Sequence, residues 1–192
     1  LITNNTGQGA PGIGLLLASM SNSTFAQNSF VGSGIVTAYF SGPTRNTFIN
    51  NDFAGPNGAV QLDNNAADNT FTANRITTTA NPGIQIGLGS HGTNLTQNNI
   101  TAATGTVVII FSQNNTLANN TITDNGASVA VSIATTGGNQ PVRNTLANNS
   151  ILSAGGTAVT INTANETLIH NNTIQANVIG VSVTSSNHTN IT

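Results

Sequence analysis

Acidic side chains are the residues of this sequence with the clearest potential for chemistry. Paired carboxylates serve in acid–base catalysis, and clustered carboxylates bind calcium. The chain has five of them, Asp52, Asp63, Asp68, Asp124 and Glu166. Counted from the recurring Asn described below, they lie at offsets +1, +12, +17, +4 and -6. Because no offset is repeated, we expect no shared catalytic or calcium-binding cluster, and we interpret Asp63 and Asp68 as turn residues.

Histidine, cysteine and glycine patterns predict no metal or cofactor site either. His91, His170 and His188 lie at unrelated places in the repeat, and the chain has no Cys. Two G-x-G-x-x-G matches, Gly7–Gly12 and Gly87–Gly92, resemble a dinucleotide fingerprint in letters only, since that fingerprint needs a following helix and an acidic residue about 20 positions later. The segments that follow are a β-like run and an Asn-rich bend, so we expect turns at both glycine matches and no cofactor.

The low charge excludes several classes of partner. Charged residues make up 4% of the 192-residue chain, against about 25% in an average domain, and there is no Lys. A net charge of -2 without a basic cluster argues against binding to nucleic acid or to an anionic membrane surface. No apolar run approaches the ~18 residues of a membrane-spanning helix, so we expect no membrane insertion. The polar surface must consist of the 32 Asn and the 45 Ser and Thr residues.

The elements that position these residues follow from a repeat. An Asn recurs at spacings of 23, 23, 23, 24, 22, 29 and 23 residues, with an apolar residue three positions before it in eight of eight units. The residue two positions after it is apolar in seven of eight units, Gly7 being the exception. The recurring residues are Asn5, Asn28, Asn51, Asn74, Asn98, Asn120, Asn149 and Asn172.

Each unit also holds a second run with strand character. Alternating β-branched residues follow a Gly-, Asn- and Thr-rich turn at Gly58–Asp63, Gly83–Leu88, Ser128–Ile133, Thr157–Asn162 and Gly180–Ser185. Helix signals are missing, with no apolar period of 3.6 residues. Units of 21–29 residues with apolar columns in register predict an all-β solenoid of about eight coils. Parallel coils stack at ~4.8 Å, and right-handed winding is the default for such crossovers.

The repeated "N-T-L-x-N-N-x-I" motif resembles the right-handed parallel β-helix repeat of pectate-lyase-like and periplasmic copper-maturation proteins. The resemblance covers nearly the whole chain and implies an internal ladder formed by the recurring Asn. Stacked amides would then satisfy one another at a bend between strands, where unpaired buried groups cost ~1–3 kcal/mol each. The alternative is that these Asn face solvent. The family includes lyases, hydrolases, adhesins, tailspikes and structural proteins, so the resemblance implies a fold and not a function.

N-glycosylation triplets are the most numerous candidate sites. Eleven occur, where about 7.5 are expected by chance from the Asn, Ser and Thr content. Several directly precede a ladder Asn, and neighbours on an extended chain face opposite ways, so we expect these side chains to point outward. A covalent glycan coat would keep so uncharged a surface soluble. The candidates are Asn4, Asn22, Asn94, Asn99, Asn114, Asn119, Asn148, Asn165, Asn171, Asn187 and Asn190.

The chain ends suggest continuation into further copies. Placing Asn190–Thr192 before Leu1–Thr6 gives a composite that matches Asn165–Thr173 at seven of nine positions, with Asn190 equivalent to Asn165. No capping helix or charged end coil is evident, although solenoids normally need one. We therefore expect a single domain, residues 1–192, that continues head to tail within one chain or between subunits. The alternative is a segment of one long β-helix.

These features favour a structural protein without catalytic activity, a glycosylated segment of an extracellular or cell-surface fibre, appendage or stalk. The first alternative is a carbohydrate-binding adhesin passenger. A polysaccharide lyase is the third interpretation. In its favour, "SHG" at Ser90–Gly92 is faintly similar to the Gly-His-Gly of polygalacturonases, but the acidic motifs of those enzymes are absent. Ice binding is weaker, because Thr70–Thr72 and Thr121–Thr123 lie at different offsets. We expect the insertion Ala134–Arg143 to bulge outward as a loop.

Overall fold

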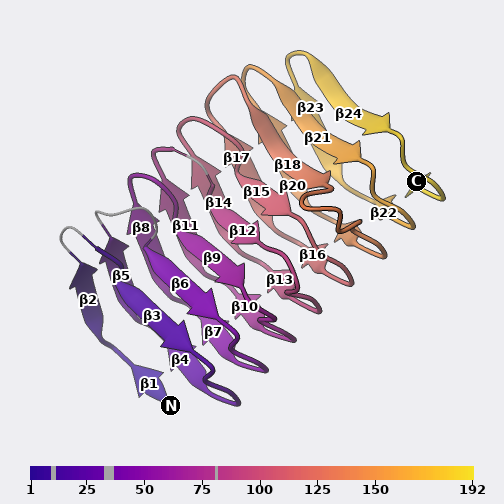
Figure 1. The fold of residues 1–192 in the computed structure, drawn as a ribbon. Helices are drawn as coiled ribbons and strands as arrows, with labels where there is room; N and C mark the ends of the chain where they lie inside the picture. The colour runs from indigo at the N-terminus through magenta and orange to yellow at the C-terminus, as the bar shows by residue number, and fades with distance from the viewer. Residues whose placement is uncertain (10–11, 33–36, 81) are drawn as a thin grey trace.

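The protein is a right-handed parallel β-helix of about eight coils, as predicted, and its described residues form strands and turns but no helix. The computed structural model describes residues 1–9, 12–32, 37–80 and 82–192. The chain winds through three strands per coil, and the coils stack from the N-terminal end to the C-terminal end (Figure 1). Within the described residues, no helix is long and apolar enough to cross a membrane.

Three parallel sheets, here named A, B and C, form the walls of the helix. Sheet A contains β1 (Ile2–Thr3), β4 (Thr24–Ala26), β7 (Thr47–Ile49), β10 (Thr70–Thr72), β13 (Asn94–Thr96), β16 (Thr116–Ala118), β19 (Thr145–Ala147), β22 (Leu168–His170) and β25 (Asn190–Ile191). Sheet B contains β2 (Thr6–Gly9), β5 (Ser29–Gly32), β8 (Asp52–Gly55), β11 (Arg75–Thr78), β14 (Asn99–Ala102), β17 (Thr121–Asp124), β20 (Ser150–Ser153) and β23 (Thr173–Ala176). Sheet C contains β3 (Leu15–Ala18), β6 (Ala38–Ser41), β9 (Val60–Asp63), β12 (Ile84–Ile86), β15 (Val108–Ile110), β18 (Val129–Ala134), β21 (Thr157–Asn162) and β24 (Ile179–Thr184).

The core is built from apolar columns that run along the stack. Phe25, Phe48 and Phe71 are opposite one another in sheet A, and their rings stack at centroid distances of 5.0 and 4.5 Å. Leu95 and Leu117 continue this column without exposed surface. Such parallel stacking buries each side chain against its equivalents above and below, as the repeat predicts.

The predicted internal ladder is present at the corner between sheets A and B. Asn28 is typical: its Oδ1 accepts from the backbone N and the Nδ2 of Asn5 at 2.9 and 3.0 Å. Its Nδ2 donates to Oδ1 of Asn51 and to the carbonyl of Ile2, both at 3.0 Å. The amides between the first and last rungs are thus satisfied inside a corner where the backbone leaves β geometry.

The residue before each ladder Asn adopts the left-handed backbone conformation at the corner between sheets A and B. Its φ lies between 53° and 57° in all eight coils, and Asn4, Asn119, Asn148 and Asn171 occupy this position. Asn is among the few non-Gly residues that tolerate this conformation. The outward direction of these side chains, expected from an extended chain, therefore results from a left-handed bend instead.

A second ladder, which the sequence analysis did not recognise, lies at the corner between sheets C and A. Oδ1 of Asn69 accepts from N and Nδ2 of Asn46, and Oδ1 of Asn144 accepts in the same way from Asn115. Thr93 interrupts this stack, and its buried Oγ1 has no hydrogen-bond partner. The signal was visible as the first Asn of "NTLANNTI", because an Asn also stands five positions before Asn51, Asn74 and Asn149.

The register at the last coil corrects one expectation. Leu168 is opposite Asn190 and Ile169 is opposite Ile191, while Oδ1 of Asn165 accepts from the backbone N of Asn187. The equivalence of Asn165 and Asn190 is therefore wrong, because the last coil advances by 22 residues rather than 25. The sequence match between the two ends does not correspond to the structural register.

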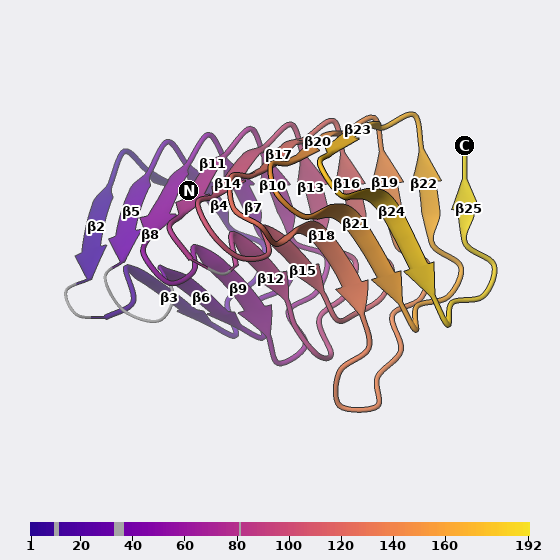
Figure 2. The same cartoon turned by 90° about the horizontal axis from the view of Figure 1, so that it is seen from above.

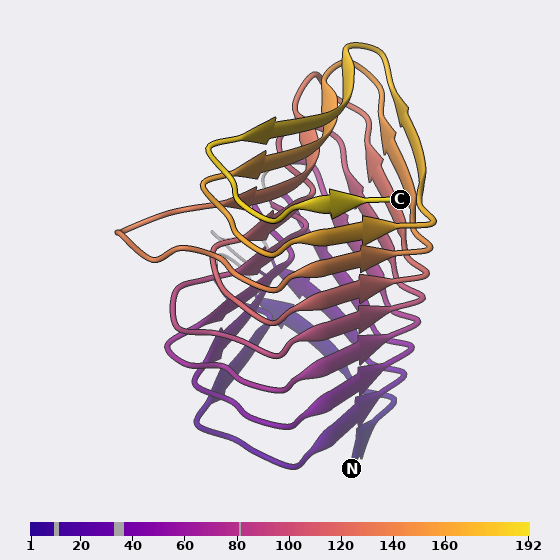
Figure 3. The same cartoon turned by 90° about the vertical axis from the view of Figure 1, so that its right-hand side faces the viewer.

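The irregular coil forms a hairpin, named here the 134–143 hairpin. It leaves sheet C after Ala134 and protrudes from the stack, confirming the expected bulge (Figures 2 and 3). Thr136 and Asn139 form an antiparallel bridge around Gly137 and Gly138, whose φ values are 56° and 79°. Glycine supplies these left-handed conformations without steric cost, as tight hairpin turns require.

Candidate functional site

The outer face of sheet C carries one column in which side-chain size changes abruptly. Asp63, Gly87 and Phe111 each lie one position beyond Leu62, Ile86 and Ile110, which are paired in successive coils. Two backbone hydrogen bonds extend this register, from Gly87 N to the Leu62 carbonyl at 2.7 Å and from Phe111 N to the Ile86 carbonyl at 2.9 Å. A carboxyl and a phenyl group therefore flank a position without a side chain.

A pocket of about 330 Å³ occupies this gap. Its lining consists of Asp63, Asn64, Gln85, Gly87, Leu88, Phe111 and Thr136. The 134–143 hairpin contributes the rim: a Cβ on Gly137 would contact the Leu88 side chain at 3.3 Å. The pocket thus combines residues from three consecutive coils with the hairpin of a fourth, and its volume lies at the lower end of known ligand sites.

Asp63 supplies the charge of the pocket. Its Oδ2 accepts a hydrogen bond from Nε2 of Gln61, and its Oδ1 leans over Gly87, where an added Cβ would lie only 1.7 Å away. Burial raises the pKa of this carboxyl above its ordinary value of 3.8, and the hydrogen bond from Gln61 partly offsets that effect. No Arg, Lys or His lines the pocket, so the charge of Asp63 is unbalanced among the described lining residues.

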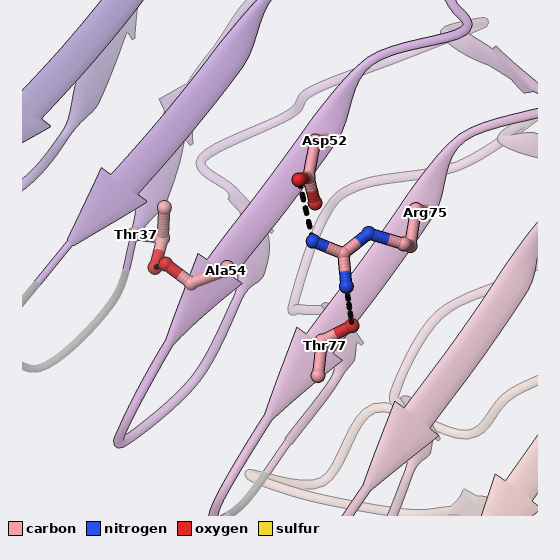
Figure 4. A network of polar contacts seen from close by, with 5 residues as sticks. All are labelled: Thr37, Asp52, Ala54, Arg75 and Thr77. Atoms are coloured by element: carbon pink, nitrogen blue, oxygen red, sulfur yellow. Dashed lines mark hydrogen bonds and ion pairs between the residues drawn. The ribbon is translucent and has the colours of Figure 1, made fainter.

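A second polar cluster lies on sheet B and is a closed ion pair. Nη2 of Arg75 on β11 lies 2.6 Å from Oδ2 of Asp52 on β8, and Nη1 of Arg75 lies 3.5 Å from Oγ1 of Thr77 (Figure 4). In the same view Oγ1 of Thr37 donates to the Ala54 carbonyl. Asp52 and Arg75 thus neutralise each other across two coils, while Oδ1 of Asp52 is buried without a hydrogen-bond partner.

The three remaining acidic residues, Asp68, Asp124 and Glu166, lie at corners of the coil, and Asp68 is an exposed bend residue with a φ of 55°. Asp124 is fully buried, and it accepts from the backbone N atoms of Gly126 and Ser128 and from Oγ of Ser153. Glu166 lies 4.0 Å from Arg143 at an exposed corner. In the described ranges, no group of three or more His, Cys, Asp or Glu side chains is placed to hold a metal ion. The five carboxyls predicted to be dispersed are not brought together.

The glycosylation candidates lie at the surface. Ten of the eleven are exposed, and Asn165 is half-buried with its Oδ1 accepting from Asn187 N. Asn94 and Asn99 are on strands, where the hydroxyl two residues later donates to the amide oxygen at 2.9 and 3.4 Å. The ladder residues, by contrast, point inward. The structure thus separates the two sets of Asn that the sequence placed side by side.

Comparison with known protein families identifies the fold. A family model described as the right-handed β-helix region matches residues 1–146. The chain belongs to the right-handed β-helix family. A comparison of this β-helix with characterised protein sequences gave no significant match.

Two solved structures resemble this β-helix. The A-module of the mannuronan C-5 epimerase AlgE4 of Azotobacter vinelandii has 14% sequence identity and a TM-score of 0.67, over 89% of this chain and 54% of that one. The Dettilon tailspike protein (gp208) has 11% identity and a TM-score of 0.64, over 86% of this chain and 38% of that one. This β-helix therefore spans about half the length of the first structure and less of the second. At such identities the likeness is one of fold.

Sequence reasoning did not find the pocket of this β-helix. Asp63 was interpreted as a turn residue, and Gly87 as part of a spurious glycine motif. The signal that could have revealed it is the alignment of Asp63, Gly87 and Phe111 one position after each sheet C run. The three residues follow one another at equal steps of 24, but they differ in type, so the column becomes evident only when the register of sheet C is known.

Proposed function

We propose that this chain is a structural protein, a stiff segment of an extracellular or cell-surface fibre, appendage or stalk that acts without catalysis. The observation that carries this proposal is the unbroken register of three parallel sheets together with two internal Asn ladders. Backbone hydrogen bonds and amide ladders all run along the same axis, so bending the rod requires breaking many of them together. Among the described residues the carboxyls are dispersed, which supports a role other than catalysis.

Open strand edges beside exposed apolar side chains support continuation of the rod into further copies. In the described chain, the outer edges of β23 and β24 have no strand beyond them, and Val178, Ile179 and Val183 are 67%, 45% and 42% exposed there. At the opposite end Leu16 on β3 is 59% exposed. Open strand edges beside apolar side chains favour pairing with another parallel coil. The occupant we propose is a further copy of this chain, placed head to tail.

A glycan coat fits the surface of such a rod. The exposed Asn candidates are spread over the outer faces and corners, whereas charged side chains are few. Covalent glycans would hydrate this surface and limit lateral association between rods. The tailspike resemblance is consistent with an extracellular location, which is part of the same proposal.

Immunogold electron microscopy of the native source material tests this function. Antibodies raised against the 134–143 hairpin recognise a feature that protrudes from the stack and can be reached in an assembled rod. We expect labels at regular intervals along filaments or stalks outside the cell. Labelling of dispersed intracellular particles would overturn the proposal.

Carbohydrate binding is a second candidate function, and the pocket on sheet C favours it. A phenyl wall, two amide side chains and a carboxyl around a hollow of about 330 Å³ match the requirements of a sugar ring, which combines an apolar face with hydroxyl groups. A structural rod that bears such a pocket would be an adhesive one, as expected for an adhesin passenger.

A further inference from the structure

The pocket on sheet C has a charge that its protein neighbours do not balance. Asp63 on β9 has Gln61 as its side-chain donor, and its Oδ1 lies over Gly87 on the floor of the pocket. The lining residues around it are amides, a hydroxyl and apolar groups. A half-buried carboxylate without a cation loses hydration that the single hydrogen bond from Gln61 replaces only in part, so an incoming cation gains a ready partner.

The opposite wall suits the other half of such a ligand. Phe111 lies two coils away from Asp63 in the same column, with Gly87 between them. At ~4.8 Å per coil the strands that carry Asp63 and Phe111 are about 10 Å apart. Because the Asp63 carboxylate leans over Gly87 in the middle coil, it lies within reach of a group that packs on Phe111. An aromatic face attracts both apolar C–H groups and nearby cations.

Amide and hydroxyl groups fill the remaining sides. Gln85 lies beside Gly87 on the sheet, and Asn64 and Thr136 contribute to the rim. These groups donate and accept hydrogen bonds without bearing charge, and this is the chemistry that binds sugar hydroxyls. An anionic sugar would meet Asp63 with no compensating cation, and such repulsion disfavours it.

We propose that the pocket between Asp63 and Phe111 binds an amino sugar with a free amine, its ammonium group against the Asp63 carboxylate and one ring face against Phe111. This inference rests on the second candidate function, carbohydrate binding, and names its ligand class. Gly87 is the specificity-determining position, because any side chain there would displace the carboxylate and fill the floor.

The pH dependence of binding follows from the same group. Asp63 is the titratable residue among the described lining residues; Tyr39 on β6 lies across Gln61 on the same face, and Asp68 follows five residues later in an exposed turn. Protonation of Asp63 removes the charge that holds the ammonium. Since burial raises the pKa of Asp63, amino-sugar affinity is expected to fall at a higher pH than it would for an exposed Asp.

The experiment is a calorimetric or NMR titration of the intact chain with glucosamine, N-acetylglucosamine, glucuronate and butylammonium. We expect glucosamine to bind about tenfold or more tightly than N-acetylglucosamine, as for one charge-assisted hydrogen bond, and glucuronate to bind least. Asp63→Asn should abolish the preference for the free amine, and Phe111→Ala should weaken binding of both sugars. Asp68→Asn, outside the lining, is the matched control and should change nothing.

Each other outcome has a distinct meaning. Equal affinity for glucosamine and N-acetylglucosamine would overturn the amino-sugar inference while leaving carbohydrate binding in place. Butylammonium binding as tightly as glucosamine would overturn it in favour of a simple organic cation, such as a lysine side chain. Absence of binding by every sugar would overturn both this inference and the second candidate function.

Discussion

Oδ1 of Asn120 accepts two hydrogen bonds from Asn98 in the preceding coil, one from the backbone N at 2.9 Å and one from Nδ2 at 3.0 Å. Nδ2 of Asn120 in turn donates to the Leu95 carbonyl and to Oδ1 of Asn149. One buried side chain therefore satisfies groups in two neighbouring coils, so the column links the corner of each coil to the next.

Replacing a central rung should be costly. Asn120→Ala leaves the backbone N–H of Asn98 buried without its acceptor. The Nδ2 group of Asn98 also loses one of its two hydrogen-bond acceptors. We expect the free energy of unfolding to fall by about 3 kcal/mol or more. Asn119→Ala is the matched control, because it removes only the residue suited to the left-handed bend and should cost about 1 kcal/mol. Urea unfolding followed by circular dichroism measures both, and equal effects would contradict the ladder's role.

Completing the interrupted second ladder should stabilise the protein. Thr93 buries a hydroxyl without a partner between Asn69 and Asn115. Thr93→Asn would place an amide oxygen where it can accept from the Asn69 backbone N–H, as Asn69 accepts from Asn46. The expected gain is about 1 kcal/mol, measured as a raised urea midpoint. Thr93→Val removes the unpaired hydroxyl without adding a rung, so its urea midpoint should rise less than that of Thr93→Asn. A larger rise for Thr93→Val would contradict the stabilising role of the added rung.

Asp63 should destabilise the fold at neutral pH. Its folded pKa is raised above the unfolded value, so the folded state holds more protons between these two values. Stability from this group is therefore present below the unfolded pKa and falls as pH rises through the folded pKa. Asp63→Asn should raise Tm at neutral pH and remove this component of the pH dependence. An unchanged or lower Tm across the whole range would show that the carboxyl is well solvated.

The outward Asn residues should carry glycans in the native protein. We expect the mass of the native protein to exceed that of its polypeptide and to fall after enzymatic deglycosylation. Asn119→Gln and Asn148→Gln should each remove one occupied site, whereas the half-buried Asn165 should be the least occupied because its amide oxygen is already engaged. A native mass equal to that of the polypeptide would exclude the glycan coat.

How far the sequence predicts the structure differs between the rungs and the pocket. Asn120, Leu117 and Ile122 recur at near-constant spacing, so their columns and the fold could be read directly from the chain. The second ladder was missed because Thr93 and Thr167 interrupt its Asn pattern. The pocket was missed for another reason: Asp63, Gly87 and Phe111 meet only through the register of sheet C, and the hairpin that closes it comes from a later coil.

Cryo-electron microscopy of the native filament is the most direct test of the structural role. The account predicts a continuous rod with one coil every ~4.8 Å along its axis and no break in the three sheets where successive copies meet. Isolated eight-coil particles with free ends, in material where no filament contains this chain, would contradict it.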